Sequence, residues 1–368
     1  MTIQSQASHP RFKRIGGELP AGYDQLTKAA HWQANWLPFS HGRAALGWLR
    51  ERQAIRSVAI CAYTCPSVPE FFRRNDISIG YFDIGASLEE IALIAQKLEK
   101  PRMVLVPALF GAPPWIDATR LSLSLDSGDV VVIDAAQTAF GHMDFAVPPN
   151  GAVLSCPRKT TGLPDGAVLA LPGVENGTGD LPVAQAAKAL KDAARALWAT
   201  GSIEYEDLAL RCHRESEAAW PDVPHRMSET SEVLLRFLDP DWHKRKRLQN
   251  WTSLRAASKA ELAIGLPPDF TPFSLPLFVE NQQELLAYLR ENRIYATALW
   301  PDAERDPSKH PLAEWCATRL VSLPIDQRHD EEDMLRVAEA VNLWAKPATR
   351  PPHQAVNPPS MTIFWPVT

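Results

Sequence analysis

Short apolar runs that alternate with helical stretches constrain the fold of this chain more than any other feature. The runs cover residues 57–63, 77–84, 103–110, 129–134, 152–155 and 166–171. A helical pattern over residues 88–100 begins with a capping box, in which Ser87 is followed by Glu90. Unbroken apolar strands joined by helices are typical of a mostly parallel sheet with helices on both faces. We therefore expect an α/β fold.

The pattern changes along the 368 residues, and this change predicts two domains. The expected parts are an N-terminal arm (1–38), a large α/β domain (39–255), a smaller α+β C-terminal domain (256–345) and a Pro-rich tail (346–368). The pattern over 181–255 predicts helices, with an interruption at Pro240. The smaller domain is marked by expected strands over 273–279, 293–297 and 318–325 and helices over 282–292 and 331–345.

The overall composition is ordinary for a soluble globular protein and argues against several classes of function. Hydrophobic residues make up 45% and charged residues 22% of the chain, and the net charge of -5 does not favour nucleic acid or anionic membranes. No apolar run approaches the roughly 18 residues of a membrane span, and the N-terminus lacks the apolar core of a secretory signal. The five scattered cysteines do not indicate a disulfide framework. We expect a cytoplasmic protein with no nucleic-acid or membrane partner.

An acid stands at the end of one of the apolar runs. Asp134 follows four apolar residues, Val130 to Ile133, so its side chain comes where a buried strand ends. In an open α/β sheet, ligands bind beyond the carboxyl ends of the strands. The same position also suits a helix N-cap or a solvated strand end, and position alone does not choose between these roles. Gln137, three residues later, could hydrogen-bond an oxygen atom of a ligand.

A lysine lies in the turn-rich loop between the next two strands. Lys159 has Pro157, Gly162 and Gly166 around it, which predict a structured turn, although a solvated surface lysine is the commoner role. A lysine amine is a nucleophile when deprotonated, a state that burial and a cation such as the adjacent Arg158 favour. An acid and a lysine at neighbouring strand ends suit pyridoxal phosphate (PLP). That cofactor needs a lysine for its aldehyde and a carboxylate for its ring nitrogen.

Two further segments offer groups that this cofactor would need. Residues 40–46 place Gly42 and Arg43 at the start of a helix, where free N–H groups and a basic side chain suit a phosphate. Tyr63, at the end of the first apolar run, could stack on an aromatic ring, although core packing is the more common role. The sequence carries no dinucleotide-binding or P-loop fingerprint, and Cys61 with Cys65 lacks the second ligand pair of a zinc site.

Taken in order, these segments resemble the DegT/DnrJ/EryC1/StrS family of fold-type I PLP-dependent aminotransferases, over roughly residues 38–345. SHGRAAL (40–46) is similar to the family's phosphate segment, and IDAAQTAFG (133–141) to its acid strand. AYTCPSV (62–68) and SCPRKTTGLPDGA (155–167) are similar to the segments with the stacking aromatic residue and the lysine. The resemblance implies a large domain with a mostly parallel sheet sandwiched by helices, plus a smaller α+β C-terminal domain.

The resemblance also implies a role for each candidate residue. Lys159 would hold PLP as a Schiff base and act as the catalytic residue. The implied cofactor-binding residues are Asp134, Gln137, Tyr63, Gly42, Arg43 and Ser155. Asp134 would pair with the ring nitrogen, Gln137 would contact the hydroxyl side of the ring, and Tyr63 would stack on it. The remaining three would bind the phosphate.

The sequence departs from the family pattern near this phosphate. Many members carry a serine five residues before the lysine, whereas Ser155 is four residues before Lys159. His41 stands between Ser40 and Gly42. Such departures are compatible with a substrate that is not a nucleotide-linked sugar.

The implied activity is transfer of an amino group from an amino-acid donor to a keto or aldehyde acceptor. A lysine at position 159 argues against the family's dehydratase branch, which has histidine there. Two alternatives stay open: a catalytically altered member with a regulatory or scaffold role, and a PLP enzyme of another reaction type, such as elimination or decarboxylation. Family members are usually homodimers with the active site at the subunit interface, so the resemblance implies a second copy as partner.

Overall fold

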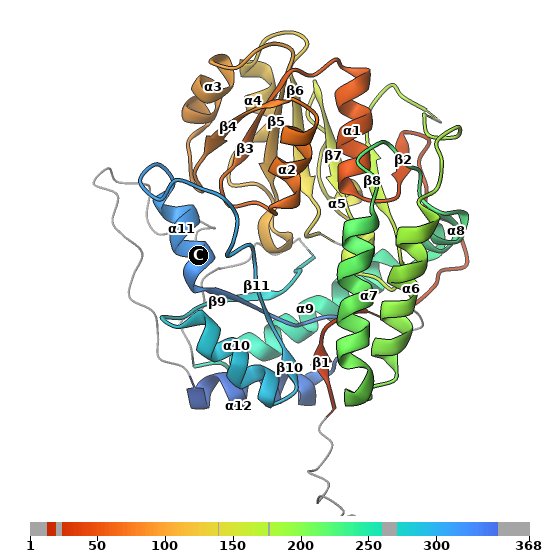
Figure 1. Ribbon diagram of the computed structural model, residues 1–368, viewed down its shortest axis with the longest axis vertical. Coiled ribbons are helices and arrows are strands. Elements are labelled where there is room, and N and C mark those ends of the chain that lie inside the picture. Colours follow the sequence, from red (N-terminus) through yellow and green to blue (C-terminus); the bar gives the residue numbers. More distant parts are fainter. Residues whose placement is uncertain (1–12, 20–23, 139, 176, 260–270, 345–368) are drawn as a thin grey trace, which may run out of the picture.

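The computed structural model describes residues 13–19, 24–138, 140–175, 177–259 and 271–344, and its largest element is a seven-stranded sheet (Figure 1). In the sheet order β2-β8-β7-β6-β5-β3-β4, the strands from β7 to β4 run parallel, whereas β8 runs antiparallel to β7 and β2. The strands are β2 (Trp36–Phe39), β3 (Ser57–Cys61), β4 (Ser78–Phe82), β5 (Arg102–Pro107), β6 (Val130–Ala135), β7 (Gly151–Ser155) and β8 (Ala167–Ala170). The expected α/β fold with a mostly parallel sheet is confirmed.

Helices cover both faces of this sheet, which explains why its strands are apolar on both sides. One face packs against α1 (Gly42–Arg52) and α2 (Ser67–Arg74). The other face packs against α3 (Leu88–Gln96), α4 (Ala118–Ser124) and α11 (Pro311–Arg319). The capping box at the start of α3 is confirmed, because the Glu90 N–H donates to Ser87 Oγ at 3.2 Å and the Ser87 N–H donates to Glu90 Oε2 at 2.7 Å.

A series of helices follows the sheet, as the sequence predicts. They are α6 (Gln185–Ala199), α7 (Glu206–Ala219), α8 (Glu229–Phe237) and α9 (Pro240–Ala257). α6 and α7 pack side by side (Figure 1). Pro240 interrupts the helical pattern because it starts α9, at a position where its missing N–H removes no helical hydrogen bond, and Asp239 caps this helix through the Trp242 N–H.

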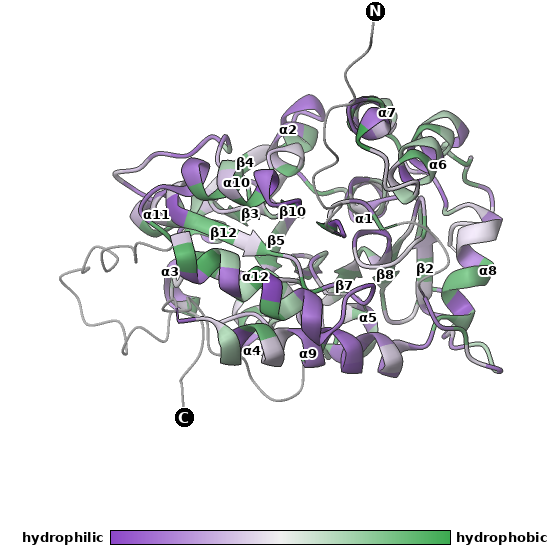
Figure 2. Ribbon diagram, turned by 90° about the horizontal axis from the view of Figure 1, so that it is seen from below, coloured by the Kyte–Doolittle hydropathy of each residue, from purple (hydrophilic) through white to green (hydrophobic). Residues whose placement is uncertain are grey.

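A second, smaller core lies in the C-terminal part of the chain. Its antiparallel strands, in the order β11-β12-β9, form one core with α10 and α12. The elements are β9 (Leu275–Phe278), α10 (Gln282–Glu291), β10 (Ile294–Tyr295), β11 (Thr297–Ala298), β12 (Leu320–Leu323) and α12 (Glu331–Trp344). α9 buries Trp251 and Leu254 in this core, so a helix expected in the large domain packs with the smaller one. Figure 2 shows how hydrophilic the outer side of α9 is.

Parts of the expected N-terminal arm belong to the two cores. Trp36–Phe39 forms β2 at the edge of the large sheet, and β1 (Ile15–Gly16) pairs in parallel with β10. Pro38 suits β2 because an edge strand tolerates a residue without an N–H. Residues 1–12 and the tail at 346–368 lie outside the described residues. Among the helices that are described, none is both long and apolar enough to cross a membrane.

Candidate active site

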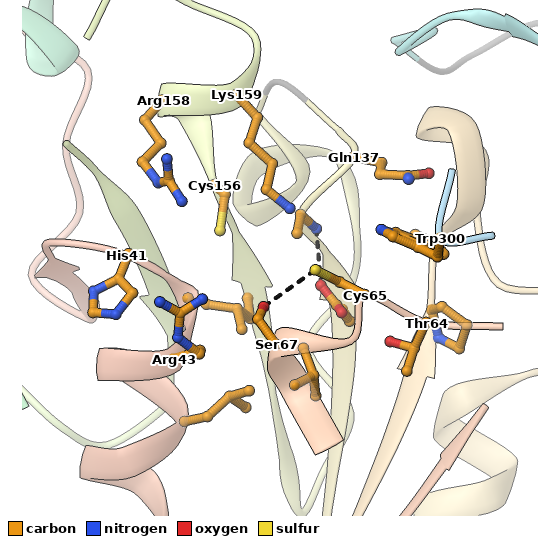
Figure 3. A pocket seen from close by; sticks show the side chains of 18 of the residues that line it. His41, Arg43, Thr64, Cys65, Ser67, Gln137, Cys156, Arg158, Lys159 and Trp300 are labelled. Carbon is orange, nitrogen blue, oxygen red and sulfur yellow. Dashed lines mark hydrogen bonds between the residues drawn. The ribbon is translucent and has the colours of Figure 1, made fainter. Parts of the chain in front are cut away.

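A cavity of about 100 Å³ lies at the carboxyl ends of β5, β6 and β7, where an α/β sheet binds ligands. Its walls come from the start of α1, the segment after β3, the three strand ends, the lysine turn and the loop that carries Trp300 (Figure 3). The predicted residues that line it are Gly42, Arg43, Asp134, Gln137 and Lys159. Tyr63 and Ser155 do not line it.

Asp134 is the acid of this cavity. It lies at the end of β6, two residues beyond Val132, whose side chain packs in the core shared with α1 and α2. Its Oδ1 accepts the N–H of Ala136 at 3.0 Å. Removal from solvent raises the pKa of Asp134, and the Lys159 ammonium acts in the opposite direction. Because desolvation disfavours the charged form of this carboxylate, a cationic N–H donor beside it would stabilise that form.

Lys159 ends a 3-10 turn over Pro157–Lys159 that follows β7. The carbonyl oxygen of Pro157 accepts the N–H groups of Thr160 and Thr161, both at 2.9 Å, and also their hydroxyl groups at 3.1 and 2.8 Å. These bonds fix the backbone of the turn. Within the described part of the chain, Nζ of Lys159 has no hydrogen-bond or ion-pair partner, and Figure 3 shows the amine pointing into the cavity.

The residues just after Lys159 are tied to distant parts of the chain. Nη2 of Arg247 and Nε2 of Gln327 both donate to the carbonyl oxygen of Thr160, at 3.1 and 2.9 Å. Asp24 accepts the N–H of Gly162 at 2.7 Å and the Gln327 amide at 2.8 Å. Because Arg247 lies on α9 and Gln327 follows β12, the smaller core holds the lysine loop of the larger one.

Gly42 and Arg43 form the first turn of α1. Among the described residues no side chain caps this helix, and its first turn contains no acid. A Cβ on Gly42 would come within 3.2 Å of Cys156 Sγ, so the missing side chain lets the helix start approach the lysine turn. The positive end of the helix dipole, together with the guanidinium of Arg43, makes this end of the cavity electropositive.

The side chain of Gln137 is oriented by the backbone of a neighbouring turn. Its Oε1 accepts the N–H of Phe110 at 2.6 Å. Phe110 has a φ of 58°, in the left-handed region, so the turn that presents this N–H to Gln137 has an uncommon backbone conformation. The amide nitrogen of Gln137 makes no hydrogen bond to the described residues and is left as a donor.

Ser155 lies on the wrong face of β7 for the phosphate role expected from the sequence. Leu154 and Cys156 face the cavity, and because side chains of a strand alternate, Ser155 faces the other side. There its Oγ pairs with Nδ1 of His142, on α5 (Gly141–Asp144), at 2.6 Å, and burial lowers the pKa of His142 to about 3. A spacing of four residues rather than five to Lys159 therefore moves the serine to the opposite face. This alternation is readable in the sequence.

Tyr63 lies behind the cavity instead of in it. It packs with Ala59 and Cys61 in the core on the opposite face from α1, and its buried hydroxyl has no partner among the described residues. Its ring meets Trp300 edge-on, with centroids 5.0 Å apart. The aromatic side chain in the cavity wall is Trp300, whose φ is 55°. Trp300 follows β11 of the smaller sheet, its side chain packs against the core of the large sheet, and the sequence contains no local signal for its position.

A second cavity, of about 680 Å³, also reaches Lys159. It lies between the α6–α7 pair and the smaller core, and its wall includes Trp198, Arg247, Leu286 and Ser322. Because Lys159 lines both cavities, its side chain lies between them.

Comparison with known proteins identifies the fold. No protein-family model matches the sequence, and no curated protein matches it. A DegT DnrJ EryC1 StrS aminotransferase from Brucella abortus has a TM-score of 0.56 at 14% identity, over 84% of this chain and 86% of the other. DesV from S. venezuelae has a TM-score of 0.56 at 17% identity, over 92% of both chains. Spr1654 from Streptococcus pneumoniae, in its PLP-form, has a TM-score of 0.56 at 11% identity, over 84% and 86%.

This chain has the fold of these aminotransferases. The architecture implied by the sequence resemblance, fold type I, is therefore confirmed. Within the aminotransferase fold of this chain, the cavity that contains Asp134 and Lys159 lies at the carboxyl edge of the large sheet.

Proposed function

We propose that this chain is a PLP-dependent aminotransferase, which moves an amino group from an amino-acid donor to a keto or aldehyde acceptor. The observation that carries the proposal is that a half-buried carboxylate, Asp134, and an unpaired amine, Lys159, line one cavity. When bound, PLP supplies an aldehyde that reacts with amines and a ring that accepts electrons while its nitrogen is protonated. The aminotransferase fold supports the proposal, since Spr1654 has this fold and was solved in a PLP-form.

The residues of the cavity fit this cofactor. Asp134 has Oδ2 free of hydrogen bonds to the described residues, and a half-buried carboxylate would favour a protonated ring nitrogen beside it. Gln137 presents an amide donor, which suits the oxygen on the ring. Gly42 and Arg43 present the helix start and a guanidinium for the phosphate. Trp300 presents an aromatic side chain for the ring face.

Lys159 has two tasks in this proposal. Its amine would hold the cofactor through the aldehyde, and once an amino donor has taken that place, the same amine would accept a proton from the α-carbon of the donor. The hydrogen bonds to the Pro157 carbonyl fix the backbone of its turn, so only the side chain has to move between the two tasks. The larger cavity on the other side of Lys159 is the space that we assign to the donor and the acceptor.

The proposal is tested by mixing the purified protein with PLP, reducing it with borohydride and mapping the modified peptide by mass spectrometry. A single adduct on Lys159 is expected. It should be absent in Lys159→Ala and kept in the matched control Lys97→Ala, which removes an exposed lysine at the end of α3. Glutamate, glutamine or alanine should then convert the bound cofactor to its amine form and release a keto acid.

Two results would count against the proposal. A wild-type protein that binds no PLP would refute the assignment of the cofactor. An adduct on Lys159 that no amino donor converts would refute the transfer reaction, and product analysis would then separate a regulatory protein from an enzyme of elimination or decarboxylation.

We also propose that the chain forms a homodimer, as the resemblance implies. Light scattering of the purified protein should give twice the 40.9 kDa of one chain. A monomer that still forms the Lys159 adduct would overturn this part of the proposal alone.

A further inference from the structure

The wall of the larger cavity, the one of about 680 Å³ that reaches Lys159, is mainly apolar. It contains the buried side chains of Trp198 and Ile294. Leu210 of α7 and Leu286 of α10 are half-buried at the same cavity, and Leu286 also packs against the smaller core. An apolar ligand that displaces water from such a wall binds favourably.

The acids of this wall are neutralised within the protein. Glu18 accepts a hydrogen bond from Nζ of Lys191 at 3.0 Å, and the same oxygen lies 2.7 Å from Nδ1 of His213. Asp326 forms an ion pair with Nε of Arg328 at 2.7 Å. Because these carboxylates already hold cations of the protein, they add little attraction for a charged ligand in the cavity.

Arg247 is a buried cation of the same wall, and its donors are directed at the backbone. Its Nη1 donates to the carbonyl oxygens of Pro272 and Phe273 at 3.4 and 3.0 Å. Its Nη2 donates to the carbonyl oxygen of Thr160 at 3.1 Å, and its Nε is buried. Arg247 therefore ties segments of the chain together and leaves few donors for a substrate.

Two cations of the wall have no partner among the described residues. One is the amine of Lys159, which has its own task in the proposed function. The other is Arg290, an exposed residue in the last turn of α10, which makes no side-chain hydrogen bond or ion pair within the described part of the chain. Figure 1 shows α10 within the smaller core, below the large sheet. The cavity therefore offers a substrate a guanidinium on the side of the smaller core.

We propose that the carbonyl acceptor is a compact molecule with an apolar body and a single carboxylate, which Arg290 binds, rather than a nucleotide-linked sugar. The inference rests on the proposed function, because that function brings the acceptor to Lys159. A nucleotide-linked sugar carries a charged pyrophosphate and several hydroxyl groups, and removing these from water requires many hydrogen-bonding partners. The described wall supplies mainly apolar surface and one guanidinium that is free to bind an anion.

The first experiment follows the acceptor half of the reaction alone. The protein is loaded with pyridoxamine phosphate, so that no amino donor is needed, and single-turnover absorbance measures the reaction with each carbonyl compound. Phenylpyruvate and phenylacetaldehyde share an apolar body, and of these two only phenylpyruvate carries a carboxylate. Both should react with the wild type, whereas a nucleotide-linked keto sugar at the same concentration should not.

Two variants test the two parts of the wall. In Arg290→Gln the second-order rate constant for phenylpyruvate should fall roughly 10-fold, as expected for a lost hydrogen bond between charged groups, while that for phenylacetaldehyde stays unchanged. In Leu286→Gln both constants should fall roughly 10-fold, because an apolar contact is lost. The matched controls are Arg120→Gln on α4 and Leu335→Gln on α12, the same changes at exposed positions outside this cavity.

A second arm measures binding without reaction. 3-Phenylpropanoate has the apolar body and the carboxylate but no reactive carbonyl. Isothermal titration calorimetry should show that it binds the wild type and both controls, with a dissociation constant about 10-fold higher in Arg290→Gln and in Leu286→Gln. A nucleotide-linked sugar without a keto group should not compete with it. The titration is made with pyridoxamine phosphate present and with the protein alone.

The outcomes separate this inference from the proposed function. If the nucleotide-linked keto sugar reacts as fast as phenylpyruvate, or if the cavity variants behave like their controls, the inference is refuted and the transfer reaction stands. If the wild type binds no pyridoxamine phosphate, or if no carbonyl compound reacts, the proposed function fails. The titration with 3-phenylpropanoate then decides the inference alone. An absence of binding, or equal affinities in the wild type and the two cavity variants, would overturn it.

Discussion

Arg195 of α6 donates from Nη2 to the carbonyl oxygen of Arg158 at 2.8 Å, and so holds the residue that precedes Lys159. Its Nε lies 3.5 Å from Oε2 of Glu18, in the segment after β1. The lysine turn is therefore supported by the helical pair as well as by the smaller core.

Arg195→Met should loosen the lysine turn. The free energy of unfolding should fall by about 2 kcal/mol, because a buried hydrogen bond from a charged group is lost. Urea unfolding measures this change, and the rate of adduct formation on Lys159 with excess PLP should fall as well. An unchanged adduct rate would show that the turn keeps its shape without Arg195.

Asp134→Asn should separate cofactor binding from catalysis. An amide does not stabilise a positive charge on the ring nitrogen as a carboxylate does, so conversion by an amino donor should slow roughly 100-fold or more. The protein without cofactor should be as stable as the wild type or more so, because burial already disfavours the charged form of Asp134. Single-turnover absorbance and thermal unfolding measure the two effects. Wild-type conversion rates in this variant would contradict the role of Asp134.

Ser155→Ala should leave the affinity for PLP unchanged, because the hydroxyl lies on the face of β7 away from the cavity. The free energy of unfolding should fall by about 1 kcal/mol, because His142 loses its hydrogen-bond partner. Urea unfolding and a PLP titration test both statements. If the variant bound PLP more weakly but bound pyridoxal, which lacks the phosphate, as tightly as the wild type does, Ser155 would be a phosphate ligand after all.

Tyr63→Phe should stabilise the protein by about 1 kcal/mol. The hydroxyl of Tyr63 is buried and has no hydrogen-bond partner among the described residues. Folding therefore removes this hydroxyl from water without replacing its hydrogen bonds, and phenylalanine avoids that cost. The ring contact with Trp300 is kept. Chemical unfolding at equilibrium measures the gain, and a loss of similar size would reveal a partner for the hydroxyl.

His142 makes stability depend on pH below neutrality. Burial lowers the pKa of His142 from 6.5 to about 3, so between these values the unfolded chain binds more protons than the folded one. Stability should therefore fall as the pH decreases through this range, by an amount on the order of 5 kcal/mol when complete. His142→Gln does not titrate and should lose less stability than the wild type between about pH 7 and about pH 4.5. Equal losses would contradict a neutral, buried imidazole.

The parts of the molecule that could be predicted from the sequence depend on local patterns. The apolar runs located β3, β5 and β6, and the Ser87–Glu90 spacing located the start of α3. Asp134 and Lys159 could be proposed because each stands close to the end of an apolar run, although position alone left other roles open for both. One element had a weaker signal: β2 has only the residues Trp36–Phe39, and Pro38 within them argues against a central strand.

Tertiary packing decided the rest of the cavity wall. Trp300 reaches the cavity from the loop after β11, a strand of the smaller sheet. Arg158 contacts Glu217, a residue 59 positions later in the chain, and no local pattern predicts that contact. The expected contact of Tyr63 with the ring depended on which face of the sheet its segment turns to after β3 ends, and no local pattern sets that turn. Ser155 is different, since counting alternate residues back from Cys156 gives its face directly.

The position of β2 sets the order in which the site can be assembled. Phe39 pairs with Ala167, and the start of α1 follows the first strand while the lysine turn precedes the second. During synthesis β2 is made long before its neighbour β8. The start of α1 can therefore contact the lysine turn only after this distant segment has been made and has paired. Such a closure over a long stretch of chain is slow. The cavity should therefore be among the last parts of the molecule to form. Binding of the cofactor would then indicate that β2 has paired with β8.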